Sequence, residues 1–147
     1  MTDNSKFTAS IANWEKKTLA LQRKIAVASV LDVINDAQKP VAKSGFMPVD
    51  TGNLRNSITM ELNASEVSKG NGDEPSGDTA IILAITKFEI GDIIAINWTA
   101  PYAMRINYGF SGEDSLGRTY NYTGTMFRDK AAAKWQNIVS KNARAAR

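Results

Sequence analysis

Apolar residues near the start of the chain recur at helical spacing over a length that a small domain cannot enclose. They form one stripe of a helical surface: Phe7, Ile11, Trp14, Leu21, Ile25 and Ala28. The pattern predicts a long helix over residues 7–38, which Pro40 ends because the residue before a proline avoids the helical region. Such a helix is more than about 45 Å long. We therefore expect part of it to project, or to lie against another subunit.

The middle of the chain predicts a small sheet. Residues 54–62 alternate in their later part and indicate a half-exposed strand. Residues 79–88 and 93–99 are apolar without alternation, which is typical of strands that are covered on both faces. Residues 63–78 contain three glycines and a proline and predict a long mobile loop. The expectation is a mostly antiparallel sheet of about three or four strands within residues 54–99.

The second half adds two helices. Pro101 and Gly109 bracket a predicted short helix over residues 101–108. Residues 110–124 are rich in glycine and tyrosine and are expected to form a loop. Thr125 is the expected cap of a C-terminal helix over residues 125–143. The chain is thus predicted to be a single α+β domain, 1–147, whose helices leave one face of the sheet for a partner chain to cover.

Composition restricts the chemistry. The chain has 147 residues and no cysteine, which excludes disulfides, thiolate metal sites and cysteine nucleophiles. It also has no histidine, the commonest general base and metal ligand. No apolar run approaches the roughly 20 residues that cross a bilayer, and the first residues are polar, so no secretory signal is expected. We expect a binding or structural protein with no catalytic residue, no metal and no cofactor.

Charge is concentrated at the C-terminus. Net charge is +3, but residues 40–127 carry −4 and residues 128–147 carry +5. Lys141, Arg144 and Arg147 are candidates for contact with phosphates or with an acidic partner. The simpler interpretation is a solvated helix end, where cations interact favourably with the C-terminal dipole.

Two further patterns have a functional and a structural interpretation. Asp50-Thr51-Gly52 is the tripeptide of aspartic proteases, which need a second carboxylate. Because a proline-broken loop precedes it here, we favour Asp50 or Thr51 as the cap of a short turn leading into residues 54–56. The aromatic cluster in residues 102–122 could stack nucleic-acid bases, but core packing or a subunit contact is favoured.

The segment from Pro48 to Ile58 resembles a signature of the tail-completion, or tail-component, proteins of long-tailed bacteriophages, Pro-x-Asp-Thr-Gly-x-Leu-Arg-x-Ser. In that family a long N-terminal helix precedes the signature and a strand hairpin follows it. Pro101-Tyr102-Ala103 and Gly109 match a second block, and Phe127 and Ala131 remain of a third. The chain departs from the pattern at Asn107, where an acidic residue is usual, and at Phe110, where threonine is usual.

The resemblance implies a structural virion protein of the phage neck. Such a protein forms a ring of six or twelve copies at the head–tail junction, after assembly in the host cytoplasm. Its partners are the head connector or stopper, the tail terminator or tail tube, and non-specifically the DNA in the channel. The implied structural or subunit-contact residues are Asp50, Thr51, Gly52, Leu54, Arg55, Ser57, Pro101, Tyr102, Ala103, Gly109 and Phe127.

One interpretation of two residues and one alternative function remain open at this point. Asp50 and Arg55 are candidates for a salt bridge or a cap that fixes the loop before the first strand. The alternative function is a small basic nucleic-acid-binding module that acts through the C-terminal helix.

Overall fold

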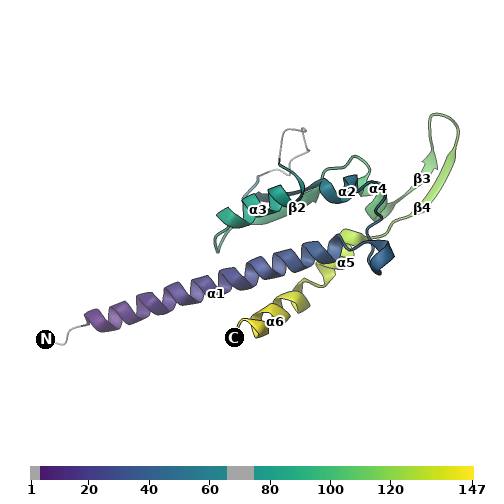
Figure 1. The fold of residues 1–147 in the computed structure, drawn as a ribbon. Coiled ribbons are helices and arrows are strands. Elements are labelled where there is room, and N and C mark those ends of the chain that lie inside the picture. Colours follow the sequence, from purple (N-terminus) through teal and green to yellow (C-terminus); the bar gives the residue numbers. More distant parts are fainter. Residues whose placement is uncertain (1–3, 66–74) are drawn as a thin grey trace.

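One helix, α1 (Ser5–Ala37), runs along most of the molecule in the computed structural model, which describes residues 4–65 and 75–147 (Figure 1). It has 33 residues and is therefore about 50 Å long. The helix ends at Gln38, whose N–H donates to the carbonyl of Ile34, and the N–H of Lys39 donates to the carbonyl of Asp36. The predicted long helix and its stop before Pro40 are confirmed.

The remaining elements are short and alternate between helix and strand. In chain order they are η1 (Val41–Lys43), α2 (Asn53–Asn56), β1 (Ile58–Leu62), α3 (Gly77–Lys87), β2 (Ile94–Trp98), α4 (Ala103–Tyr108), β3 (Gly109–Glu113), β4 (Thr119–Thr123), α5 (Phe127–Ala133) and α6 (Trp135–Ala145). The α+β class, with a long N-terminal helix and a C-terminal helix, is confirmed. The strands form two separate antiparallel pairs instead of one sheet: β1 with β2, and β3 with β4.

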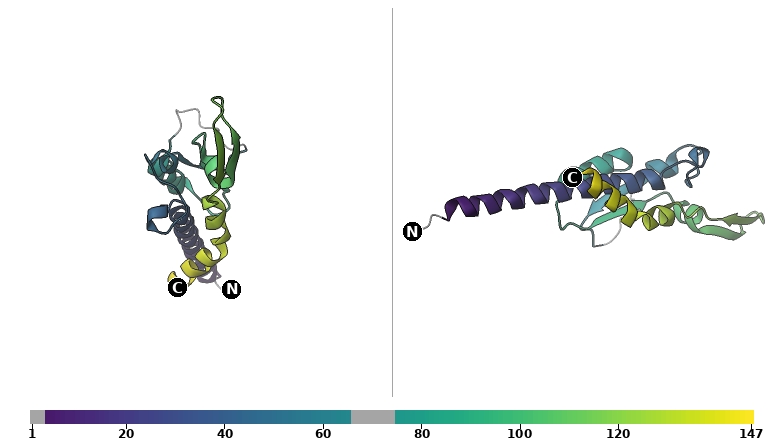
Figure 2. Two further views of the ribbon diagram at one scale, coloured as in Figure 1. Left: turned by 90° about the vertical axis from the view of Figure 1, so that its right-hand side faces the viewer. Right: turned by 90° about the horizontal axis from the view of Figure 1, so that it is seen from below.

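These elements lie along α1 and leave its N-terminal part without cover. In Figure 1, α3 and the β1–β2 sheet lie on one side of α1, and α5 and α6 lie on another. The N-terminal part of α1 extends beyond all of them at one end, and the β3–β4 hairpin projects at the other, as the right-hand view of Figure 2 also shows. The molecule is therefore elongated, with a projection at each end.

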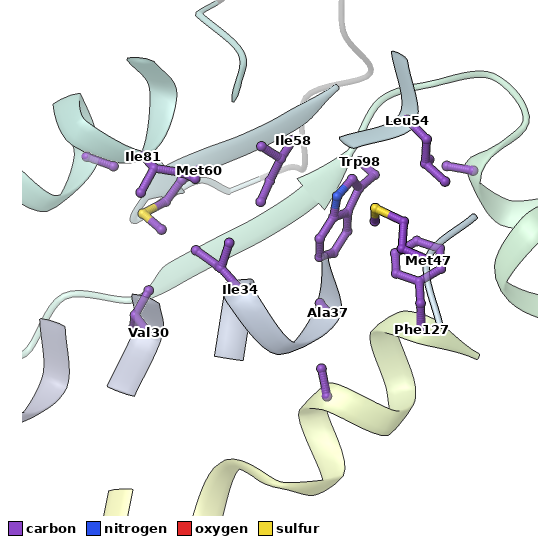
Figure 3. Close-up of a cluster of buried hydrophobic side chains, with 13 residues drawn as sticks. Val30, Ile34, Ala37, Met47, Leu54, Ile58, Met60, Ile81, Trp98 and Phe127 are labelled. Carbon is purple, nitrogen blue, oxygen red and sulfur yellow. The ribbon is translucent and has the colours of Figure 1, made fainter. Parts of the chain in front are cut away.

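The core lies where the C-terminal half of α1 meets β1, β2, α3 and α5 (Figure 3). Trp98 of β2 meets Phe127 of α5 edge to face, with ring centroids 5.2 Å apart and an interplanar angle of 88°. Both rings pack at the centre of one cluster, formed by Val30, Ile34, Ala37, Met47, Leu54, Ile58, Met60, Ile81, Ala84, Trp98, Ala103, Phe127 and Ala131. The buried residues of α1, which are Ser29, Val30, Ile34 and Ala37, thus all lie in its second half, and no residue of the predicted stripe is buried.

The predicted strand over residues 79–88 is wrong, because this segment is helix α3. Ala80, Ile81 and Ala84 are its buried residues, a spacing that selects one face of a helix. A short apolar run cannot be assigned to strand or helix by periodicity alone. The expected cover on both faces is also absent, since Ile82 is 63% exposed.

The predicted half-exposed strand is β1, and it is more buried than expected. Ile58, Thr59 and Met60 are consecutive and all buried, so both faces of β1 are covered at that end. The contacts of α3 with β1 account for part of this cover. Most of the predicted mobile loop over residues 63–78 lies outside the described residues, and its last two residues, Gly77 and Asp78, begin α3.

The predicted loop over residues 110–124 is wrong as well, because it contains the β3–β4 hairpin, in register from Gly109↔Thr123 to Glu113↔Thr119. The Asp114 carboxylate closes the turn by accepting hydrogen bonds from the backbone N–H groups of Leu116 and Arg118, both at 2.9 Å. Tyr120 and Tyr122 are two residues apart, which is strand spacing that the glycines around them obscured.

The C-terminal helix over residues 125–143 is two helices, α5 and α6, joined at Lys134. Thr125 is not the cap of α5. That position belongs to Met126, which has a φ of 54° and makes no side-chain capping hydrogen bond. The N–H of Met126 donates to the carbonyl of Asn107 instead, so a contact with α4 fixes the start of α5.

Gly109 begins the hairpin in a conformation that requires glycine. Its φ is 90° and its ψ 170°, a region that residues with a Cβ essentially do not occupy. A Cβ there would also lie 2.5 Å from the carbonyl oxygen of Tyr122. Gly109→Ala is expected to lower the free energy of unfolding by at least about 2 kcal/mol, as measured by chemical denaturation.

Gly91→Ala is the matched control for that variant. Gly91 also has a positive φ, of 106°, but a Cβ there meets nothing within 4 Å. Gly91→Ala should therefore introduce the backbone strain without the clash, and it should lower the free energy of unfolding by less than Gly109→Ala does. If the two variants lose the same free energy of unfolding, the close approach of β4 to Gly109 does not contribute to the loss in Gly109→Ala.

Candidate assembly surfaces

The projecting part of α1 carries an uncovered apolar stripe. We call residues Ser5–Gln22 the rod, and its exposed apolar side chains Phe7, Ile11, Trp14 and Leu21 the rod stripe. Phe7 and Trp14 are each 68% exposed. The rod is followed by Arg23, whose guanidinium donates to the carbonyls of Ile85 at 2.8 Å and Phe88 at 2.9 Å. A row of large apolar side chains with no cover indicates a contact surface.

A second apolar surface lies where α1, β2, α5 and the start of α6 meet. It is a groove of about 640 Å³ lined by Ala26, Val30, Val33, Ile34, Ala37, Phe88, Asp92, Ile94, Ile96, Trp98, Arg128, Ala131, Ala132 and Trp135. Among the described residues that line it, Asp92 and Arg128 are the ionic ones. Hydrogen bonds from Asn63 and from the backbone of Glu89 lower the pKa of Asp92. The groove therefore carries one negative charge, at Asp92, and one positive charge, at Arg128, in an otherwise mostly apolar lining.

One polar atom of a groove residue has no partner. The indole N–H of Trp98 is buried, and among the described residues no acceptor lies within hydrogen-bond distance. Trp98 is 9% exposed. A buried donor without an acceptor costs about 1–3 kcal/mol.

The two blocks that carry the family resemblance meet in space. They line a pocket of about 340 Å³, the signature pocket, formed by Pro48, Asp50, Thr51, Gly52, Asn53, Leu54, Tyr102 and Ile106. Gly52, with φ 84°, precedes α2, and no side chain caps that helix. The predicted cap by Asp50 or Thr51 is therefore wrong. Asp50 and Arg55 form none of the ion pairs within the described residues, so that pairing is not supported either.

The other signature residues tie the loop to the core. The carbonyl of Arg55 accepts a 3.0 Å hydrogen bond from the buried Gln38 side chain at the end of α1. Ser57 donates to the carbonyl of Leu54 at 2.7 Å, and its own carbonyl accepts from the backbone of Thr99 at 3.0 Å. Pro101 is exposed in the turn before α4, whereas Ala103 is buried. This part of the signature is structural, whereas Asp50, Thr51 and Tyr102 are exposed.

A polar network on α4 and α5 was missed by sequence reasoning. Asn107 is buried, and its amide donates to the Asp129 carboxylate at 2.5 Å while its oxygen accepts from the N–H of Arg128 at 3.1 Å. The hydrogen bonds from Asn107 and then Arg128 lower the pKa of Asp129. Arg128 also hydrogen-bonds the Tyr108 hydroxyl. The only signal was that Asn107 stands where the resemblance has an acidic residue.

Asn107→Ala is expected to raise the pKa of Asp129 toward its ordinary value, because the largest cause of its depression is removed. A depressed carboxyl pKa stabilises the fold above the unfolded value of about 4, and this contribution is lost as pH falls through the folded value. An NMR titration of the Asp129 carboxyl carbon, in the unmodified chain and in the variant, measures this change in the pKa of Asp129. The Asp92 carboxyl, which Asn63 and Glu89 hold, is the internal control and should keep its titration.

The C-terminal cations are partly engaged within the chain. Lys141 lies 3.5 Å from Asp32 of α1, and Lys134 pairs with Asp36 at 2.8 Å. Lys141 and Arg144 line a shallow hollow on α6 with Asn137, Ser140 and Ala145. Arg147, the last residue, is exposed. The structure therefore brings Lys141 and Arg144 together on one helix surface.

Comparison with known proteins gives no match: no family model, no curated protein and no solved structure is similar to this chain. Within residues 4–65 and 75–147, no helix is long and apolar enough to cross a membrane. The same residues contain no group of three or more acidic side chains placed to hold a metal ion.

Proposed function

We propose that this chain is a structural subunit that assembles with copies of itself into a ring at the head–tail junction of a long-tailed bacteriophage. The observation that carries the proposal is that one molecule presents both an exposed apolar rod stripe and an open apolar groove. Large uncovered apolar surfaces on a small domain mark sites of association. Two different surfaces on one chain favour head-to-tail contacts, which close into a ring when the rotation allows it.

The resemblance in the signature segment supports the location. It implies a ring of six or twelve copies around the DNA channel, between the head connector or stopper and the tail terminator or tail tube. The signature pocket supports a role in contact, because Asp50, Thr51 and Tyr102 are exposed around it while the residues behind them anchor the loop. The projecting β3–β4 hairpin offers a further contact at the end opposite the rod (Figure 2).

The test is assembly of the purified chain, alone and with connector and tail components, followed by native mass spectrometry and electron microscopy. The expected result is a closed ring and, in the assembled particle, density for this chain at the neck. A chain that stays monomeric at high concentration and with those components present would contradict the proposal.

A second candidate function is non-specific nucleic-acid binding through α6. It is favoured by the net charge of +5 on residues 128–147 and by the shared hollow of Lys141 and Arg144. Each phosphate contact makes affinity fall with salt. For this candidate, replacing Lys141, Arg144 and Arg147 with Ala should weaken DNA binding strongly and lower the salt slope by up to about 3. Unchanged affinity would exclude it, and the ring proposal expects the same variant to assemble normally.

A further inference from the structure

We propose that α6 is a releasable arm: Asp32 and Asp36 of α1 hold it in place, and a polyanion that binds its lysines frees it. The polyanion is defined by its chemistry, the phosphate chain of a nucleic-acid backbone. The contact between α1 and α6 is then autoinhibitory, because it occupies cations that the polyanion needs. This inference does not depend on the proposed ring. It deepens the second candidate function, on which its polyanion step rests.

α6 is not anchored in the core. None of the eleven residues that the structure describes in α6 is buried, and Ile138 and Val139 are only half-buried. α5, directly before it, buries Phe127 and Ala131. The two helices separate at Lys134 and lie end to end on the same side of α1 (Figure 1). α6 can therefore leave α1 while α5 stays packed.

Two ion pairs join α6 and its junction with α5 to α1. Asp36 pairs with Lys134 at 2.8 Å, and Asp32 lies 3.5 Å from Lys141. The two lysine side chains are 49% and 71% exposed. Ion pairs as exposed as these are weak, and salt screens them. We therefore expect the contact of α6 with α1 to loosen as the salt concentration rises.

A hydrogen-bonded group completes this contact. The Asn142 amide donates to the Asp32 carboxylate at 3.0 Å and to the Ser29 hydroxyl at 3.2 Å. Ser29 is fully buried, whereas Asn142 is half-buried. Ser29, Asp32 and Asp36 follow one another at intervals of three and four residues, so they lie on one face of α1. We call these three residues the latch.

The latch competes with phosphate for the same lysines. A phosphate group accepts hydrogen bonds from a lysine ammonium as a carboxylate does, so a polyanion that takes Lys134 and Lys141 removes both lysines from the latch. Residues 128–147 carry a net charge of +5, which attracts such a chain. By linkage, release of α6 and binding of the polyanion favour each other by the same factor. Loss of the latch charges should therefore raise the affinity for the polyanion.

The test removes the latch charges by combining Asp32→Asn with Asp36→Asn in one chain, and follows α6 by hydrogen–deuterium exchange. In the unmodified chain, exchange of the α6 amides is expected to become faster with salt, while α5 keeps its protection. In the latch variant, the α6 amides should exchange at least about 10-fold faster than in the unmodified chain at low salt, because two ion pairs are lost. Their exchange should no longer respond to salt.

Asp50→Asn with Glu89→Gln is the matched control. It removes the same number of charges from exposed residues that take part in none of the ion pairs within the described part of the chain. Exchange of the α6 amides should be unchanged in this variant. Its net charge equals that of the latch variant, so a difference between the two in polyanion binding is caused by the latch.

Oligothymidylate is the polyanion probe. It should speed exchange of the α6 amides in the unmodified chain, and it should bind the latch variant at least about 5-fold more tightly than the control variant. A third chain, Ser29→Cys with Asn142→Cys, joins α6 to α1 by a disulfide where the two side chains already lie 3.2 Å apart. The sequence has no other cysteine. The oxidised form should bind the probe more weakly than the reduced form of the same chain.

The outcomes are distinct. Exchange of the α6 amides that is as slow as that of α5, and that ignores both salt and the latch substitutions, would overturn the releasable arm. Binding of the probe without faster exchange, or with equal affinity in the oxidised and reduced chains, would overturn the autoinhibition. Absence of probe binding to every variant would remove the polyanion step together with the second candidate function. None of these measurements requires a ring, so they leave the proposed function to its own test.

Discussion

Phe127→Ala is expected to lower the free energy of unfolding by about 3–5 kcal/mol, the range for removal of a buried aromatic ring from a packed core. Phe127 is 2% exposed and is the first residue of α5. Its ring forms a T-shaped pair with Trp98, so the variant also loses an aromatic pair worth about 0.5–1.5 kcal/mol beyond area burial.

The position of Phe127 makes that loss difficult to recover. The ring joins α5 to β2 within the buried cluster (Figure 3). Met126 holds the start of α5 by a backbone hydrogen bond to Asn107, which limits how far the helix can move to fill a cavity. Cores that cannot collapse show the larger costs in a series of equal substitutions.

Equilibrium unfolding in urea, followed by circular dichroism, measures the effect. Met104→Ala on α4 is the matched control, because Met104 is 72% exposed and its removal should change stability by no more than about 0.5 kcal/mol. A loss below about 1 kcal/mol for Phe127→Ala would show that α5 is not anchored by this ring. Because Trp98 also lines the groove, the variant should weaken assembly as well as folding.

Patterns that repeat along the sequence were predictable, and those decided by distant contacts were not. The stripe from Phe7 to Ala28 could be predicted from helical periodicity alone, and Pro40 predicts where the helix ends. The run that forms α3 gave no periodicity to choose between helix and strand, and its packing against β1 decided the outcome. The β3–β4 hairpin was hidden by glycines, one of which, Gly109, the hairpin requires.

The candidate surfaces were predictable to different degrees. An exposed rod follows from a helix that is longer than its domain, and the sequence alone indicates it. The groove does not, since Ala26, Ile96, Trp98 and Ala132 come from segments that only the fold brings together. The signature pocket is intermediate: both of its blocks were identified as a resemblance, but their meeting at Tyr102 and Ile106 is a property of the structure.

Replacing Phe7 and Trp14 together with Ser is expected to abolish self-association at concentrations where the unmodified chain assembles. A large aromatic side chain has about 150–250 Å² to bury, and each of these is 68% exposed in the single molecule. At about 25 cal/mol per Å², covering what is exposed contributes about 2.5–4 kcal/mol for each ring. Allowing for the ordering cost of association, the double substitution should weaken each contact at least about 1,000-fold.

The same substitution is expected to leave the fold intact, because neither ring belongs to the core and the rod begins beyond the contacts of Arg23 with α3. Its free energy of unfolding, measured at a concentration where the unmodified chain is monomeric, should change by less than about 1 kcal/mol. Leu19→Ser is the matched control, since Leu19 is an exposed apolar residue of the rod that lies off the stripe; it should assemble normally. Sedimentation velocity of the three proteins decides the matter: assembly that survives loss of both rings would show that the rod projects for another purpose, and unfolding of the double variant would show that the rod belongs to the fold.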